Sequence, residues 1–134
     1  MRVNHGEVGE RGAAAVEFAF VAMLLVTLLM GIMEFGYAFF AQGTIAGSAR
    51  EAARYYAIHH QEADASTKAA AAAHEALGVL DPAKVVIAPF GCASGAGGDD
   101  AVTVTITYDF EGGLTGFFPL IPDLKATGTM RCSG

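Results

Sequence analysis

The fold is decided by residues 13–40, which read AAAVEFAFVAMLLVTLLMGIMEFGYAFF. Sixteen uncharged residues separate Glu17 from Glu34, and Glu34 is the only charged residue among residues 18–49. A transmembrane helix needs about 20 mostly apolar residues, and Ala14–Met33 supplies them with one acid near the start. A run that is apolar on every face is typical of a helix surrounded by lipid. The sequence therefore predicts a membrane-spanning helix close to the N-terminus.

This helix is expected to continue beyond the membrane. No proline occurs between Ala13 and His60, and 48 helical residues would extend about 70 Å. After Ala38 the apolar run is interrupted by polar residues: Gln42, Thr44, Ser48, Arg50, Glu51 and Arg54. Since no helix stop marks this change, we expect one helix that is half in the membrane and half in water.

Composition excludes several classes of protein. The chain has 134 residues, enough for one domain, and its 53% hydrophobic and 16% charged residues exclude a disordered chain. A net charge of −6 leaves too few bases to neutralise nucleic-acid phosphates, so no nucleic-acid partner is expected. Residues 1–12 are polar and contain three glycines, which predicts a leader or a disordered tail.

The C-terminal part predicts a second helix and a small sheet. Residues 61–80 form the helix candidate, with Asp64 or Ser66 as its N-cap and Gly78 just after its end. Asp81-Pro82 then predicts a turn. From Lys84 the pattern alternates with period two, and it predicts strands over Val85–Ile87, Val102–Phe110 and Leu124–Arg131, with a glycine-rich loop over Gly91–Asp100.

The expected fold class is therefore α+β, with a long N-terminal helix, a second helix and an antiparallel sheet of about three strands. The expected divisions are a leader over 1–12, a membrane and extended helix over 13–60, and a domain over 61–134. Cys92 and Cys132 are the only cysteines, and an even count in a small exported domain predicts one disulfide between them.

No catalytic, metal or cofactor site is expected. His59, His60, Glu62 and His74 lack the convergent spacing of a metal site, and solvated histidines at a helix end are the simpler interpretation. The glycines before Asp99-Asp100 lead into a strand and not into a helix, unlike a phosphate-binding loop. No nucleophile motif is present.

The junction at residue 12 suggests processing. If the chain is cut after Gly12, Ala13 gains an ammonium group and Glu17 becomes the fifth residue. A carboxylate near the membrane core normally has a partner. The Ala13 ammonium of a neighbouring copy could neutralise Glu17, and within one helix that geometry is less favourable.

Gly12, Glu17 and Phe18 before an apolar helix resemble a type IV prepilin processing site. The longer strings, residues 12–19 (GAAAVEFA), 31–36 (GIMEFG) and 49–54 (AREAAR), resemble TadE-like pseudopilins of the tight-adherence (Tad) pilus system. The resemblance covers residues 10–57, and three blocks agree in order and spacing. The chain lacks the proline that many relatives carry after the Glu-Phe pair, so a straighter membrane helix is expected.

The resemblance implies a membrane-anchored pseudopilin, or minor pilin, that functions in the assembly of adhesive Tad pili. A prepilin peptidase would cleave between Gly12 and Ala13 at the cytoplasmic face. Its partners would be that peptidase, sister pseudopilins and pilin subunits, in the inner membrane with the C-terminal domain outside. Incorporation into the pilus is left open. Removal of 12 residues from 134 would leave 122, and this length favours a minor subunit, because the main subunits of this pilus type are usually much shorter.

Two alternatives stand beside this reading. In one, Glu17 is an interfacial residue of an uncleaved single-pass anchor that carries an extracytoplasmic binding module. The other is a conventional cleaved signal peptide, which is disfavoured because Glu34 interrupts the apolar run and no small-residue site closes it.

Three further features have open interpretations. Glu34 could pair with another subunit in the membrane, together with Glu17 and Phe18, or could be solvated near the outer headgroups. Gly36, Gly43 and Gly47 either allow close helix packing, which is favoured, or mark local looseness. The apolar segment 112–123, with Phe117 and Phe118, either folds back as a lid, which is slightly favoured, or docks a partner.

Overall fold

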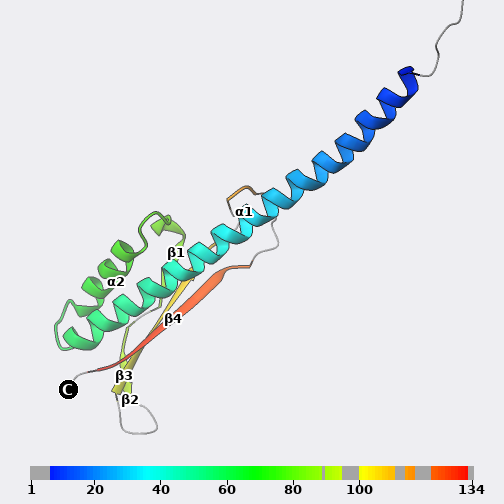
Figure 1. The fold of residues 1–134 in the computed structure, drawn as a ribbon. Coiled ribbons are helices and arrows are strands. Elements are labelled where there is room, and N and C mark those ends of the chain that lie inside the picture. Colours follow the sequence, from blue (N-terminus) through cyan, green and yellow to red (C-terminus); the bar gives the residue numbers. More distant parts are fainter. Residues whose placement is uncertain (1–6, 89, 95–99, 111–113, 117–121, 133–134) are drawn as a thin grey trace, which may run out of the picture.

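The computed structural model describes residues 7–88, 90–94, 100–110, 114–116 and 122–132. Helix α1 (Glu7–His59) forms a long rod, and the rest of the chain is packed against its C-terminal half (Figure 1). The absence of proline and the abundance of alanine and leucine allow this helix to run without a break. It begins before the expected Ala13, because part of the predicted leader continues the helix, and it ends at His59 as expected.

Helix α2 (Ala65–Ala76) lies beside the end of α1 after a short turn (Figure 1). It is shorter than the expected 61–80. Asp64 occupies the N-cap position but makes no side-chain cap hydrogen bond, and it pairs with Lys68 at 3.0 Å instead. Gly78 follows the helix with φ +61°, the left-handed conformation that glycine adopts most easily, as predicted. Asp81 then accepts a hydrogen bond from the Ala83 amide and starts a short 3-10 turn, Pro82–Lys84.

The sheet is antiparallel and three strands wide. Strand β3 (Asp100–Tyr108) lies in the centre, and β4 (Leu124–Arg131) pairs with nearly its whole length. The other edge of β3 is shared by β1 (Val85–Ile87) and β2 (Cys92–Ser94). The long helix, second helix and three-strand-wide sheet confirm the predicted α+β fold. β2 corrects the expectation that Gly91–Asp100 is entirely a loop, because Cys92–Ser94 pair with β3.

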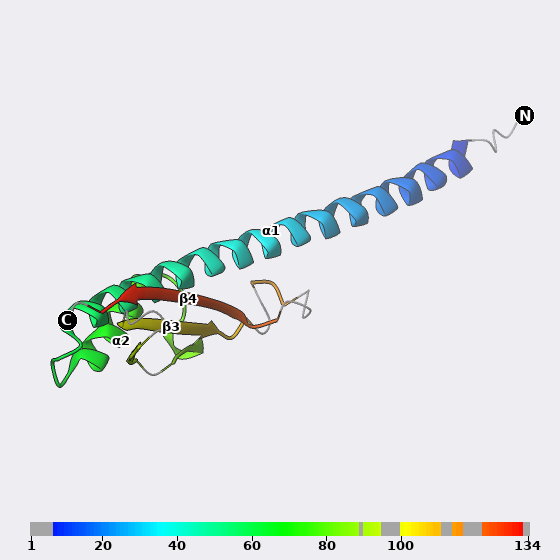
Figure 2. The same ribbon diagram turned by 90° about the horizontal axis from the view of Figure 1, so that it is seen from below.

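One face of the sheet packs on α1, as the two views show (Figure 2). The predicted alternation in β3 is confirmed, since its apolar set is buried while Thr103 on the other face is exposed. The helices contribute small side chains to this core, which lets them approach the sheet and each other closely. The buried helix residues include Ala41, Ile45, Ala49, Ala52, Ala53, Ala65, Ala69 and Ala73.

Gly128 allows the closest approach between the sheet and α1. A Cβ atom built on Gly128 would overlap the Ala49 carbonyl and would lie 2.6 Å from the Arg50 amide nitrogen. Both obstacles are backbone atoms, which cannot move to another rotamer. This position in β4 therefore requires glycine.

Candidate membrane anchor and subunit-contact surface

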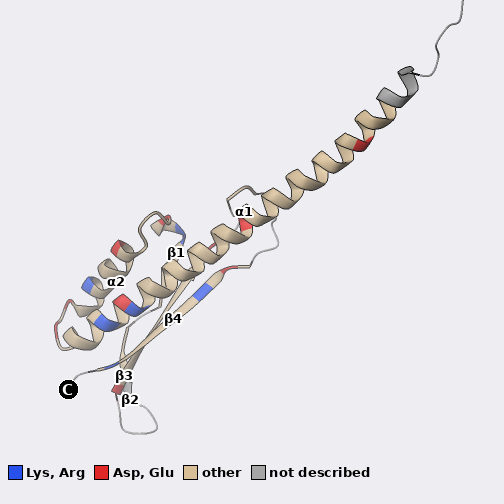
Figure 3. Ribbon diagram, in the orientation of Figure 1, with Lys and Arg blue, Asp and Glu red and all other residues tan. Residues whose placement is uncertain are grey.

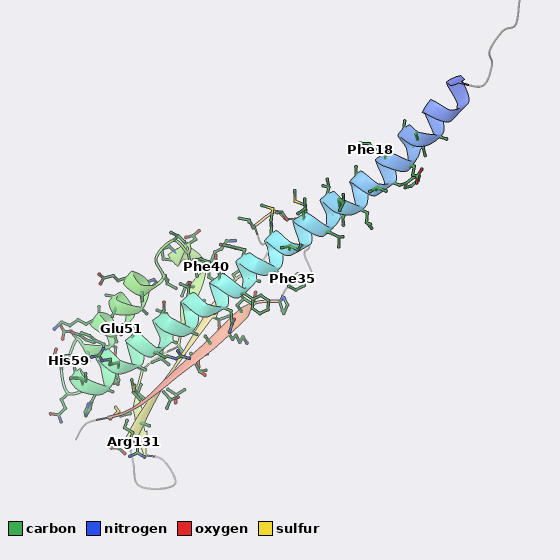
Figure 4. The ribbon with its side chains drawn as sticks, in the orientation of Figure 1. Phe18, Phe35, Phe40, Glu51, His59 and Arg131 are labelled. Atoms are coloured by element: carbon green, nitrogen blue, oxygen red, sulfur yellow. A yellow bond between two sulfur atoms is a disulfide. The ribbon has the colours of Figure 1, made fainter. Side chains whose placement is uncertain are left out.

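The N-terminal half of α1 extends away from the domain and is exposed on its apolar sides. Within Gly12–His59, an 18-residue window has a mean hydropathy of 2.4, and none of that window is buried. Phe18, which is 72% exposed, lies on this free stretch (Figure 4). Among the residues coloured in Figure 3, most charged residues lie on the domain and on the adjoining part of α1, and one acidic residue lies on the free stretch. The helix is long and apolar enough to cross a membrane, and it differs from the core helix of a soluble protein in being uncovered.

The expected processing junction lies inside α1. Gly12 and Ala13 are helical and exposed, and a Cβ atom built on Gly12 would meet nothing within 4 Å. Glu17 is exposed one helical turn after Ala13. The carboxylate therefore lies on the same side of the helix as the residue that cleavage would make N-terminal.

Glu34 lies in a site that neither sequence interpretation anticipated. It is only 1% exposed, so the solvated alternative is wrong. One carboxylate oxygen accepts a hydrogen bond from the Leu114 amide at 3.0 Å, and the other accepts from the Thr115 amide at 3.1 Å and from the Thr115 hydroxyl at 2.8 Å. Three donors from one loop therefore hydrogen-bond the carboxylate within the same chain.

We call this contact between Glu34 and residues 114–115 the Glu34 clasp. It attaches the β3–β4 connection to α1 at the point where the free helix ends and the domain begins (Figure 1). An aromatic group lies next to it, in which the Tyr37 ring is 5.6 Å from the Phe110 ring and the Tyr37 and Tyr108 hydroxyls are 3.5 Å apart. Burial, together with the Tyr37 hydroxyl, raises the pKa of Tyr108 to about 12.

The three helix-packing glycines lie along the exposed side of α1. Gly36, Gly43 and Gly47 are exposed, and a Cβ atom on any of them would meet nothing within 4 Å. Their spacing of seven and four residues keeps them on one side of the helix, away from the buried Ala41 and Ile45. No described part of this chain packs on them, so close packing at this surface would require another chain.

The predicted disulfide is present between Cys92 in β2 and Cys132, directly after β4. The disulfide lies at the end of the sheet that is far from the free helix. There it joins β2 to the end of β4, the two strands that pair with opposite edges of β3. His60 lies beside it, and its ring and the two sulfurs have potential ligand atoms within 4.8 Å of one another. The sulfurs are bonded to each other, so they do not offer the thiolates that a metal ion would bind.

The other residues considered for a metal site are not among the groups of potential ligand atoms found in the described part of the chain. His59 stacks on Tyr55 at 4.3 Å, and its Nδ1 lies 3.0 Å from the Tyr55 carbonyl oxygen. Glu62 pairs with Lys68 at 3.1 Å, and His74 is exposed on α2. These residues do not form one group.

The apolar segment 112–123 is only partly described. Phe117 and Phe118, on which the lid and docking alternatives depend, lie outside the described residues. Within the described part, Leu114 is 55% exposed and Pro122 is exposed, while the backbone at 114–115 is fixed by Glu34. The choice between the two alternatives therefore stays open.

Sequence reasoning missed the roles of two residues. Thr115 had no local signal, because its partner is 81 positions away. Gly128 did have one, since a glycine on the apolar face of a predicted strand often marks close backbone approach.

In a comparison with protein families, residues 12–54 match the family described as TadE-like protein. The matched region starts at the expected cleavage site and ends on the part of α1 that packs on the domain. Comparisons with curated proteins and with solved structures gave no significant match. Over residues 12–54, which include the free apolar helix, this chain is therefore similar to the TadE-like proteins of the Tad pilus system.

Proposed function

We propose that this protein is a membrane-anchored pseudopilin, or minor pilin, that acts in the assembly of Tad pili. The observation that carries the proposal is the TadE-like match over residues 12–54 on a helix whose apolar N-terminal half is uncovered. Such a surface is stable in lipid or against other apolar helices, and not in water. The proposal gives the chain no catalytic role.

A prepilin peptidase would cleave between Gly12 and Ala13. Two features support this step: the Gly12, Glu17 and Phe18 pattern, and the free space around Gly12, which lies far from the folded domain. A peptidase could reach this junction without unfolding the rest of the chain.

After cleavage, Glu17 would pair with the new Ala13 ammonium of a neighbouring subunit, with Phe18 beside it in the apolar contact. The exposed position of both side chains supports this role. An ammonium–carboxylate pair in a low-dielectric region is strong only when both charges are present, because either charge alone is costly there.

The exposed glycine side of α1 would be the helix-packing surface. Gly36, Gly43 and Gly47 permit a partner helix to approach the backbone closely, and no described residue of this chain occupies that space. The C-terminal domain would lie outside the inner membrane, which agrees with its disulfide, since disulfides persist in oxidising compartments.

The alternative is an uncleaved single-pass protein whose domain binds a ligand or partner outside the cell membrane. The two functions differ in the N-terminus of the mature chain. Mass spectrometry of the membrane-extracted protein should find Ala13 as the first residue if the pseudopilin proposal holds. A start at Met1 or Arg2 would support the uncleaved anchor.

Variants separate processing from assembly. Gly12→Val should abolish cleavage, whereas the matched change Gly31→Val in the same helix should leave it intact. Glu17→Gln should allow cleavage and insertion but reduce pilus formation. Normal pilus formation by Glu17→Gln would contradict the pairing role while leaving the processing step untouched.

A further inference from the structure

Three residues with metal-binding side chains come together at the end of the domain that lies far from the free helix. His60 follows α1, Cys92 opens β2, and Cys132 follows β4. Each offers one potential ligand atom, and the three atoms lie within 4.8 Å of one another. Among the described residues, no other group of three or more histidine, cysteine or acidic side chains converges in this way. In both views the end of β4 reaches the end of α1, which brings these residues together (Figures 1 and 2).

Backbone contacts hold the two cysteines in place independently of their disulfide. Cys92 pairs with Val102 in the β2–β3 ladder, and the Cys132 amide donates to the Asp100 carbonyl oxygen at 2.8 Å. Both cysteines are therefore attached to the same end of β3, with their Cα atoms 6.3 Å apart. Reduction of the disulfide removes one bond and leaves these backbone contacts in place.

The His60 ring makes the hydrogen bond that is typical of a metal-binding histidine. Its Nδ1 lies 3.2 Å from the Ala57 carbonyl oxygen, an acceptor that needs the ring proton on Nδ1. Nε2 then carries the lone pair of the ring. Metal-binding histidines commonly donate one ring N–H to a carbonyl oxygen in this way and bind the metal through the other nitrogen.

Two thiolates and one imidazole are a donor set for zinc. Zn²⁺ is bound tetrahedrally by sulfur at about 2.3 Å and by nitrogen at about 2.0–2.1 Å, so its ligand atoms lie about 3.5–3.8 Å apart. From a separation of up to 4.8 Å, the imidazole must approach by about 1 Å while the two sulfurs move apart, and side-chain rotation supplies both shifts. Soft thiolate ligands select zinc over Mg²⁺ and Ca²⁺, which prefer oxygen. All three residues are partly exposed, so water can complete the coordination.

We propose that His60, Cys92 and Cys132 bind one Zn²⁺ ion when the disulfide is reduced. The two thiols release their protons to solvent and each forms a Zn–S bond, so binding needs no oxidant or reductant. The disulfide is the two-electron oxidised form of the same pair of sulfurs, and it excludes the ion because neither sulfur is then a thiolate. The metal ion and the disulfide are therefore alternative cross-links at the same end of the domain.

The two cross-links differ in what they join. The disulfide joins β2 to the end of β4, whereas the ion also holds His60 and thereby the end of α1. A newly synthesised chain has free thiols, because the cytosol keeps cysteines reduced. The ion holds the end of the sheet against α1 before the disulfide forms. This inference depends neither on membrane anchoring nor on a role in pilus assembly.

Co²⁺ in place of Zn²⁺ makes the site visible, because thiolate-to-cobalt charge transfer reports sulfur ligands and the visible absorption of Co²⁺ reports tetrahedral geometry. The full-length protein in detergent micelles is reduced with a phosphine, freed of metal, and titrated with Co²⁺ and then with Zn²⁺. His60→Ala removes the nitrogen ligand, and Cys92→Ser removes one sulfur. His74→Ala is the matched control, because His74 is exposed on α2 and lies outside the group. The unreduced protein is the second control.

We expect the reduced protein to bind one Co²⁺ per chain with both absorption signatures, and Zn²⁺ to displace it. His60→Ala should weaken Co²⁺ binding by at least about tenfold, since loss of even a hydrogen-bond partner of a metal ligand costs that much. His74→Ala should bind as the unchanged protein does, while Cys92→Ser and the unreduced protein should lack the tetrahedral spectrum. Absence of that spectrum in the reduced protein, or equal affinity in His60→Ala, would overturn the inference.

Intrinsic tyrosine fluorescence shows whether the reduced, metal-free protein keeps its fold. If reduction unfolds the domain, Zn²⁺ should restore the emission of the unreduced protein, because metal binding then drives folding. His60→Ala should need at least about tenfold more Zn²⁺ for the same recovery. Failure of Zn²⁺ to restore the emission, or recovery of His60→Ala at the same Zn²⁺ concentration, would contradict the site.

Discussion

Replacing Gly128 by alanine tests the packing of the sheet on α1. The added Cβ would overlap the Ala49 carbonyl and lie 2.6 Å from the Arg50 nitrogen, whereas ordinary contacts of a Cβ are 3.4 Å or longer. β4 must therefore move away from the helix by roughly 1 Å, and this loosens the core on both sides of the contact. Overpacking of this kind costs about 1–3 kcal/mol.

We expect a loss near 3 kcal/mol, the upper end of that range, because backbone faces backbone and no side chain can rotate away. All four tyrosines lie at residue 37 or later, so intrinsic tyrosine fluorescence follows unfolding of the domain in detergent micelles. With a urea dependence of about 1–3 kcal/mol/M, the unfolding midpoint should fall by at least about 1 M.

Gly43→Ala is the matched control, since Gly43 lies in the same contact region of α1 but faces open space. Alanine is favoured over glycine in a helix by about 1 kcal/mol, so this variant should be slightly more stable. If Gly128→Ala unfolds at the same urea concentration as the unchanged protein, the close approach of β4 to α1 is refuted.

Four other outcomes are expected. Glu34→Ala should accelerate amide hydrogen exchange at Leu114 and Thr115, because about 1.5–3 kcal/mol is lost for each hydrogen bond to a charged group. Thr115→Val removes only the hydroxyl and should have a smaller effect. Unchanged exchange in Glu34→Ala would contradict the Glu34 clasp. The double variant Cys92→Ala, Cys132→Ala should lose about 4 kcal/mol of unfolding free energy in the same urea assay, the value of the chain-entropy model for a separation of 40 residues. Equal gel mobility of the unchanged protein with and without reductant would show that no disulfide forms. The Tyr108 pKa is raised from 10.0 to about 12 in the folded state, so the associated stability is present below pH 10 and is lost as the pH rises towards 12. Tyr108→Phe should therefore lose less stability than the unchanged protein over that pH range. Identical pH profiles of stability for the two proteins would contradict the shift. Ser48→Ala should raise stability by about 1 kcal/mol, since the Ser48 hydroxyl is buried without a hydrogen-bond partner among the described residues, and a loss of stability would indicate a hidden partner such as water.

The sequence by itself determined the order and type of the main elements. Composition and periodicity favour a backbone conformation locally, independently of tertiary contacts. The uncharged run after Glu17 and the lack of proline up to His60 favour a helix. The alternation in Val102–Phe110 favours a strand. The same local logic located Gly78 after the second helix. The disulfide followed because only two cysteines were available.

Tertiary structure decided the features that depend on distant partners. Glu34 is satisfied by residues 80 and 81 positions later, and Gly128 is required by a helix backbone almost as far away in sequence. The local sequence pattern carries no signal for such pairs, because their burial and hydrogen bonding depend on which distant segment of the chain packs against α1. The strand β2 was missed for a similar reason. Cys92–Ser94 has a weak strand propensity alone, and pairing with β3 stabilises the extended conformation. What the return of the chain to α1 adds is a carboxylate that is buried and hydrogen-bonded within the same chain.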